Sequence, residues 1–167
     1  MMNGWIKYMV MFTVVVLAQV LVFNQIHMGG YLNPYIYVLF ILLPPVSMLP
    51  YQVLLLSFLV GITVDWFSNT LGLHAAASVL LGFLRLPVIN LITQRDAEKV
   101  NYPGLQQTGW RRFLLYTSIL VVIHHFFLFF TEVFSFAGFF RTVLRSMASS
   151  VLTITILVIS QLLVFRE

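Results

Sequence analysis

Long apolar runs, each broken by only one or two polar residues, make up most of the chain. An α-helix rises about 1.5 Å per residue, so roughly 20 apolar residues cross the ~30 Å hydrocarbon core of a bilayer. The runs predict helices at about residues 6–24, 33–49, 51–67, 70–92, 112–132 and 141–164. We therefore expect an all-α, polytopic membrane protein of about six transmembrane helices in a single domain, with a polar loop at about 93–111.

Prolines make the second predicted helix the least regular. Asn33-Pro34 favours a helix start, because Asn is a good N-cap and Pro fits the first helical position. Pro44-Pro45 then interrupts the run, because proline removes a helical hydrogen bond. Either the helix continues with a kink to about Leu49, or it is a half-span. In the second case five helices cross the membrane.

Composition agrees with a membrane location and excludes several kinds of site. Hydrophobic residues make up 60% of the chain and charged residues 8%, whereas a soluble domain has about 25% charged residues. The absence of cysteine excludes disulfides, thiolate catalysis and Cys-based metal sites. The net charge is +4, but 9 Lys and Arg residues are too few to follow the phosphates of a nucleic acid. We expect no nucleic-acid partner.

The basic residues are unevenly divided between the two sides of the predicted helices. If the N-terminus is inside, the inner side carries Lys7, Arg85, Arg95, Lys99, Arg111, Arg112 and Arg166. The outer side carries only Arg141 and Arg145. Because Lys and Arg are enriched on the cytoplasmic side of membrane proteins, both termini are predicted to be cytoplasmic.

The chain offers little for catalysis. It has no phosphate-binding glycine loop and no Ser/His/Asp set, so we expect no enzyme activity, no catalytic residue and no cofactor. A metal site needs three or four convergent ligands, and the rings of the adjacent His124 and His125 splay apart on one helix. A metal site or proton relay is therefore the weaker interpretation.

Several polar residues fall within the predicted helices. We expect a polar interior formed by His74, His124, Glu132, Ser149 and Thr153. Hydrogen bonds between helices are the favoured use of these side chains. For the serine and threonine stripe of the last helix, a lined cavity or a contact surface for a partner is the alternative.

Asp65 is the sharpest candidate for a function. An ionisable group within a membrane span costs about 2.5–3.5 kcal/mol at the bilayer centre and less near the interface. Asp65 lies in the last turn of the third predicted helix, beside Trp66 and one turn after Gly61. One interpretation is a contact or ion-linked site facing another helix. The other is an acceptor for exposed N–H groups of the following turn and helix.

The fourth predicted helix is rich in small residues. Gly72 with Ala76, and Ser78 with Gly82, form pairs at the spacing that brings transmembrane helices into close contact. Packing within the protein is the commoner use of such pairs, and a partner interface is the alternative.

The segment from Ser57 to Ala76 resembles the central signature of the MreD family of rod shape-determining membrane proteins. That signature reads approximately Gly-x-x-x-Asp, a short turn, and then Leu-Gly with small residues. The matching positions are Gly61, Asp65, Leu71, Gly72 and Ala75. The chain length, the number of spans and the short basic loop after the fourth helix also agree. The Pro44-Pro45 kink and the aromatic-rich fifth helix do not match the family pattern.

The resemblance implies a non-enzymatic scaffold of the cell-wall elongation machinery, located in the bacterial inner (cytoplasmic) membrane and regulating cell shape. The implied partner is an MreC-like bitopic membrane protein, and through it MreB, RodA and a penicillin-binding transpeptidase. The resemblance is also compatible with a homo-oligomer. We expect the partner-binding, helix-packing residues to be Gly61, Asp65, Leu71, Gly72, Ala75 and Ala76.

A second function follows from the same resemblance. The six-helix arrangement of the family is similar to the substrate-binding subunits of energy-coupling-factor transporters, which makes a solute-binding membrane subunit of a vitamin-type transporter the alternative. Such a subunit needs an enclosed polar pocket. Asp65, Trp66, His74 and Glu132 are the residues that could cluster to form it at the outer ends of the helices.

Overall fold

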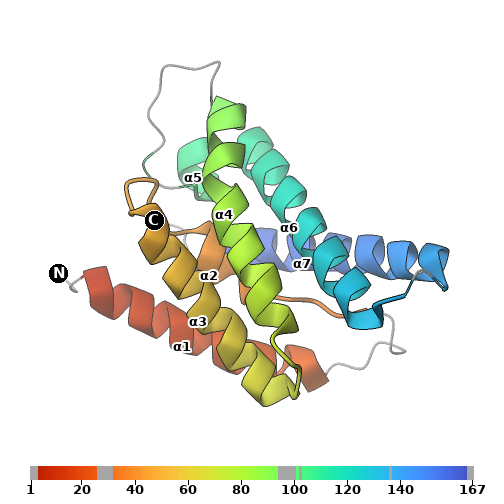
Figure 1. Ribbon diagram of the computed structural model, residues 1–167. Helices are drawn as coiled ribbons and strands as arrows, with labels where there is room; N and C mark the ends of the chain where they lie inside the picture. Colours follow the sequence, from red (N-terminus) through yellow and green to blue (C-terminus); the bar gives the residue numbers. More distant parts are fainter. Residues whose placement is uncertain (1–3, 26–31, 94–100, 102, 136, 165–167) are drawn as a thin grey trace.

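The computed structural model describes residues 4–25, 32–93, 101, 103–135 and 137–164 (Figure 1). Within these ranges the chain is helical and contains no β-strand. The helices are α1 (Gly4–Leu21), the 3-10 helix η1 (Phe23–Gln25), α2 (Val38–Leu42), α3 (Pro50–Ser68), α4 (Leu73–Thr93), α5 (Leu105–Thr108), α6 (Trp110–Val133) and α7 (Phe139–Val164).

Five of these helices, α1, α3, α4, α6 and α7, are long and apolar enough to span a bilayer. The prediction of an all-α membrane domain is therefore confirmed. The predicted helix over 33–49 is wrong in extent, because only Val38–Leu42 form the helix α2. Six transmembrane helices are thus not found in the described part of the chain. The sidedness of the termini stays a prediction, and Arg95, Lys99 and Arg166 lie outside the described residues.

The other predicted boundaries are close to those observed, and local geometry explains the differences. The fourth helix begins at Leu73 instead of residue 70. Gly72 has φ +80°, a left-handed conformation that a right-handed helix does not contain. At its other end α4 continues through Pro87 to Thr93. The predicted polar loop contains the single-turn helix α5, and its residues 94–100 and 102 lie outside the described part.

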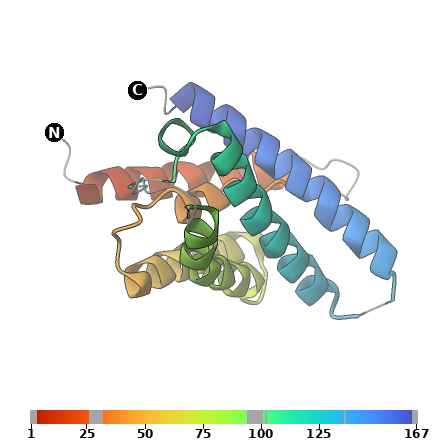
Figure 2. The ribbon, with the colours of Figure 1, turned by 90° about the horizontal axis from the view of Figure 1, so that it is seen from above.

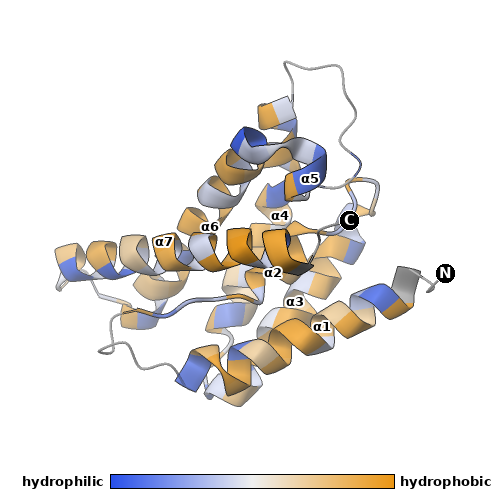
Figure 3. Cartoon of the chain, turned by 180° about the vertical axis from the view of Figure 1, so that it is seen from behind, coloured by the Kyte–Doolittle hydropathy of each residue, from blue (hydrophilic) through white to orange (hydrophobic). Residues whose placement is uncertain are grey.

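The long helices form a row in which each packs against the next. α4 packs between α3 and α6, α6 packs against α7, and α1 packs against α3 (Figures 1 and 2). The outward surfaces of α1 and α7 are mainly hydrophobic, and hydrophilic residues lie mainly near helix ends and in α5 (Figure 3). This is the distribution that lipid around the middle of the helices requires.

Residues 32–49, here called the return segment, connect α1 to α3 through the interior of the protein. α1 and α3 run in roughly the same direction (Figure 1), so the chain between them must travel back. Tyr37 contacts His74 near the start of α4, and Leu42 is bonded to Arg85, about 16 Å further along that helix. Residues 37–42 are at most 4% exposed.

Most of the return segment lacks the internal hydrogen bonds of a helix, and this determines what surrounds it. Irregular backbone at membrane depth is tolerated only where it is buried in protein, because each unpaired N–H or C=O group in hydrocarbon costs several kcal/mol. Polar side chains from α1, α4, α6 and α7 supply the missing partners, as described next.

Two hydroxyl groups of α7 hold the beginning of the return segment. The backbone N–H of Asn33 donates to Ser149 Oγ at 3.1 Å, and the backbone N–H of Tyr35 donates to Thr153 Oγ1 at 3.1 Å. Ser149 and Thr153 are at most 1% exposed. The predicted helix start at Asn33-Pro34 is therefore not found. The non-helical backbone there is hydrogen-bonded to the polar stripe of the last helix.

Gln19 of α1 makes the matching contact from the other side. Its Nε2 donates to the carbonyl of Pro34 at 3.1 Å, and its Oε1 accepts the backbone N–H of Ile36 at 2.8 Å. Gln19 is fully buried. A side-chain amide can satisfy one donor and one acceptor at once, so a single glutamine pairs two backbone groups here.

The carbonyl groups of Leu42, at the end of α2, and of Pro44, just after it, are bound by Arg85 and Tyr116. Arg85 Nε donates to the carbonyl of Leu42 at 3.4 Å, and its Nη2 donates to the carbonyl of Pro44. The Tyr116 hydroxyl also donates to Leu42, at 2.9 Å. Arg85 is 2% exposed, so this cation lies against backbone oxygen atoms at the negative end of a short helix.

Candidate functional site

Asp65 caps the start of α4. Its Oδ1 accepts hydrogen bonds from the Thr70 hydroxyl and from the backbone N–H of His74 (3.0 Å), and its Oδ2 accepts from the backbone N–H of Ala75 (2.8 Å). The side chain is buried, with 2% of the residue exposed. A carboxylate in this position pairs the free N–H groups of a helix start and lies at the positive end of its dipole. Of the two interpretations of Asp65, the one that makes it an acceptor for N–H groups of the next helix therefore describes these contacts.

Gly61 lies where the backbone of α3 comes very close to the backbone of α4. A Cβ atom at this position would come within 2.6 Å of Ala75 Cα and 2.7 Å of the His74 carbonyl oxygen. Only a residue without a side chain fits that distance. Gly61 and Asp65 therefore make their contacts inside the protein, one by close packing and the other by hydrogen bonds.

The other predicted contact residues lie nearer the surface. Leu71 is fully exposed, and Ala76 is exposed, whereas Ala75 is 5% exposed. Gly72, Ala75 and Ala76 line an open apolar groove of about 680 Å³. Its other lining residues come from α3, α4 and α6: Leu54, Phe58, Ile62, Val79, Leu80, Phe83 and Phe127.

A second hollow, the polar cavity, lies where α1, α3 and α6 end and α4 and α7 begin. Its volume is about 430 Å³. The polar residues that line it are Asn24, Gln25, Asn33, Tyr35, Ser68, Thr70, His74, Glu132 and Arg145. This brings His74 and Glu132 together, as the transporter alternative requires. Trp66, in contrast, is 84% exposed, and Asp65 is not among the lining residues.

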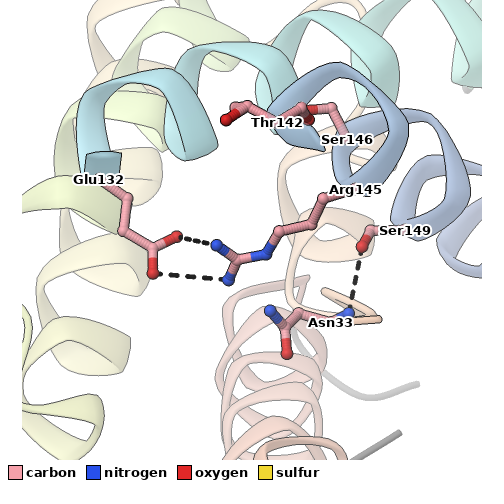
Figure 4. Close-up of polar contacts among 6 residues, drawn as sticks. All are labelled: Asn33, Glu132, Thr142, Arg145, Ser146 and Ser149. Carbon is pink, nitrogen blue, oxygen red and sulfur yellow. Dashed lines mark hydrogen bonds and ion pairs between the residues drawn. The ribbon is translucent and has the colours of Figure 1, made fainter. Parts of the chain in front are cut away.

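An ion pair forms one wall of the polar cavity. Arg145 Nη1 lies 3.0 Å from Glu132 Oε2, and Nη2 donates to Oε1 at 3.4 Å (Figure 4). The guanidinium carbon also lies 4.2 Å from the centre of the Phe129 ring. With its amide oxygen turned towards Arg145, Asn33 accepts a further hydrogen bond of 2.7 Å. Glu132 is thus paired with a cation that the sequence did not suggest as its partner.

A hydrogen-bonded chain of aromatic side chains leads from the cavity into the core. The Tyr37 hydroxyl lies 2.9 Å from His74 Nδ1 and 2.8 Å from His124 Nε2. A hydroxyl has one proton, so it donates to one histidine and accepts from the other. If it donated to His124, the Nδ1 atom of a neutral His124 would carry the proton, and that buried atom has no partner. The favoured arrangement therefore runs from His124 N–H to Tyr37 and from Tyr37 O–H to His74.

This arrangement fixes the proton of His74. Because Nδ1 accepts from Tyr37, a neutral His74 carries its proton on Nε2. His74 lines the polar cavity and is 5% exposed. The cavity wall is thereby given an N–H donor.

His125 supports the return segment through a hydrogen bond to Thr153. Its Nδ1 lies 2.9 Å from the Val121 carbonyl, which can only accept, so Nδ1 donates and Nε2 accepts the Thr153 hydroxyl at 3.1 Å. Thr153 in turn accepts the N–H of Tyr35. No group of three or more His, Asp or Glu side chains suited to a metal ion is found among the described residues.

Sequence reasoning missed Tyr35, Tyr37 and Arg145. The two tyrosines lie in the segment that was expected to be a regular helix, where nothing marks them as partners of distant histidines. Arg145 carried a detectable signal, since it and Glu132 are opposite charges that flank the short connection between the last two helices. In the sequence, the charge of Arg145 was used only to assign the two sides of the membrane.

The fold and the buried polar contacts define the class as a multi-pass helical membrane protein. No protein-family model, curated protein or solved structure matches the chain. The resemblance to MreD stays a prediction from the sequence.

Proposed function

We propose that the protein is a non-enzymatic scaffold of the cell-wall elongation machinery in the bacterial inner membrane, and that the apolar groove binds the single transmembrane helix of an MreC-like partner. MreB, RodA and a penicillin-binding transpeptidase would be reached through that partner. The groove is the observation that supports this proposal most strongly, because it offers an open apolar surface made partly of small residues.

The chemistry of the groove suits a helix. Association of transmembrane helices depends on close van der Waals packing, because lipid is as apolar as the side chains. Gly72, Ala75 and Ala76 allow a second backbone to approach, and the exposed Phe58 and Phe83 add apolar contact area. A straight helix makes more contacts in such a channel than mobile lipid tails do.

The proposal changes the set of partner-binding residues expected from the motif. Gly61 and Asp65 act from inside, by fixing where α4 begins and how close it lies to α3. Gly72, Ala75 and Ala76 form the surface itself. The motif then specifies the shape of the groove, and only some of its residues touch the partner.

The test is recovery of the partner after purification in detergent. Ala76→Phe fills the groove, and the matched control Val151→Phe adds the same side chain to an exposed position on α7. We expect the MreC-like protein to be lost with Ala76→Phe and retained with Val151→Phe, with both variants as stable as the wild type. Equal recovery with the two variants would contradict the proposal.

A second candidate, the solute-binding subunit of a vitamin-type transporter, is favoured by the polar cavity of about 430 Å³. Ligand sites are typically cavities of roughly 300–1,000 Å³ with a few well-placed polar groups. A purified protein that retains a solute, and that recovers no single-span partner, would support this candidate over the scaffold.

A further inference from the structure

We propose that the polar cavity binds a small zwitterion, in which an ammonium group and a carboxylate or phosphate group lie a few bonds apart. This site goes beyond the scaffold function and does not rest on it, because the cavity and the apolar groove share no lining residue.

Two deeply buried side chains on the cavity wall have unused hydrogen-bonding atoms. Tyr35 is 8% exposed and His74 is 5% exposed. Neither the Tyr35 hydroxyl nor His74 Nε2 makes a hydrogen bond to another described residue, although both residues line the cavity. Neither atom is among the buried unpaired atoms of the described residues, so both are open to the cavity, where a ligand or solvent can pair them.

The charges of the cavity select the kind of ligand. Glu132 and Arg145 are the two charged residues among those that line it, and they cancel. A ligand with a net charge would leave that charge uncompensated in a partly buried site, which is costly. A zwitterion can place its cation beside Glu132 and its anion beside Arg145 while these two stay paired with each other, so that the site remains neutral.

The donors support the same assignment. In the favoured arrangement of the Tyr37 hydrogen bonds, His74 presents an N–H group through its Nε2. An anionic group bound by Arg145 could therefore accept a second hydrogen bond from His74 or from the Tyr35 hydroxyl. The Glu132 side chain is 41% exposed and thus accessible to an ammonium group, whereas the Arg145 side chain is 19% exposed.

The position of the cavity leaves two sources for such a zwitterion. Because the cavity lies where several spanning helices end, it is near one face of the membrane. A phosphatidylethanolamine headgroup could enter from the bilayer, and a free zwitterion could enter from water. Both present the same ammonium and anion.

The experiment compares ligands of different charge on the purified full-length protein in detergent. Phosphoethanolamine is the zwitterion, methyl phosphate the anion and ethanolamine the cation, and binding is measured by calorimetry and by the shift in Tm. We expect phosphoethanolamine to bind at least about tenfold more tightly than either ion. No binding of phosphoethanolamine, or tighter binding of either ion, overturns the proposal without any variant being needed.

Charge-neutralising variants provide a second measurement. Glu132→Gln should shift the preference towards methyl phosphate, and Arg145→Gln should shift it towards ethanolamine. The matched control Arg141→Gln removes an exposed charge that does not line the cavity and should leave the order unchanged. A loss of all binding in folded variants, with no change of preference, contradicts the charge assignment.

The source of the zwitterion is distinguished in nanodiscs. If a lipid headgroup is the ligand, discs of phosphatidylethanolamine should raise the Tm relative to discs of phosphatidylglycerol and should weaken the binding of free phosphoethanolamine. If the ligand is a free solute, phosphoethanolamine should bind equally in both discs. Partner recovery is measured separately, so failure here leaves the groove test unaffected.

Discussion

Replacing Gly61 with alanine tests the close packing of α3 against α4. A Cβ atom at residue 61 would lie 2.6 Å from Ala75 Cα, so the two helices must separate by about 1 Å to reach ordinary contact. Overpacking of this kind costs about 1–3 kcal/mol. Alanine regains about 1 kcal/mol through its higher helix propensity, so we expect a net destabilisation of about 0–2 kcal/mol.

Gly82→Ala is the matched control, because it gains the same helix propensity on the same pair of helices. Its new Cβ atom would meet the Ser57 hydroxyl oxygen instead of a backbone atom. A side chain can rotate away, at the cost of its hydrogen bond to the Val53 carbonyl. Gly82→Ala should therefore be less destabilising than Gly61→Ala by about 1 kcal/mol, since a backbone contact can relax only by moving a helix.

The assay is equilibrium unfolding in mixed micelles, followed by circular dichroism, with the free energy of unfolding compared between the two variants. We expect a lower free energy of unfolding for Gly61→Ala than for Gly82→Ala. A Gly61→Ala protein at least as stable as Gly82→Ala would refute it, and would mean that the α3–α4 contact is looser than the structure has it.

Three further changes test the polar contacts of the core by the same unfolding measurement. Thr153→Val leaves a backbone N–H and a histidine nitrogen unpaired and should cost about 1–3 kcal/mol, whereas Thr155→Val, whose exposed hydroxyl bonds only within its own helix, should be close to neutral. Arg85→Met removes the donor to the Pro44 carbonyl and one of the two donors to the Leu42 carbonyl, and should cost at least about 2 kcal/mol, against less than about 0.5 kcal/mol for the exposed Arg111→Met. Asp65→Ala leaves the start of α4 without its cap and should cost about 1–2 kcal/mol. Equal stability within either matched pair, or no loss with Asp65→Ala, would show that these contacts are not those that hold the return segment and α4 in place.

The five long helices could be predicted from the sequence because each is a continuous apolar run, and such runs are a local property. The contact between Asp65 and the start of α4 was also within reach, since the carboxylate and its N–H partners are at most ten positions apart. Local spacing leaves few other geometries for a carboxylate that directly precedes a turn and a helix.

The return segment could not be predicted in the same way. The side chains that pair its backbone groups include Gln19, Arg85, Tyr116, Ser149 and Thr153, which are distributed over four helices. No periodicity within residues 32–49 indicates these distant partners. The apolar composition alone fits a spanning helix, and only the prolines indicated that the segment would be irregular. The polar cavity was predicted only in part, from His74 and Glu132, because Asn33 and Tyr35 reach it through this segment.

The return segment also sets an order in which the protein can be completed. The backbone N–H groups of Asn33 and Tyr35 are bonded to residues 116 and 118 positions later in the chain. A growing chain emerges from its N-terminus, so these acceptors do not exist when residues 33 and 35 leave the ribosome. Until α7 is made, those N–H groups must stay in water or find temporary partners. α7, which is made after the other described helices, is therefore the one that seals the interior around this early segment, and a chain truncated before α7 is expected to remain open.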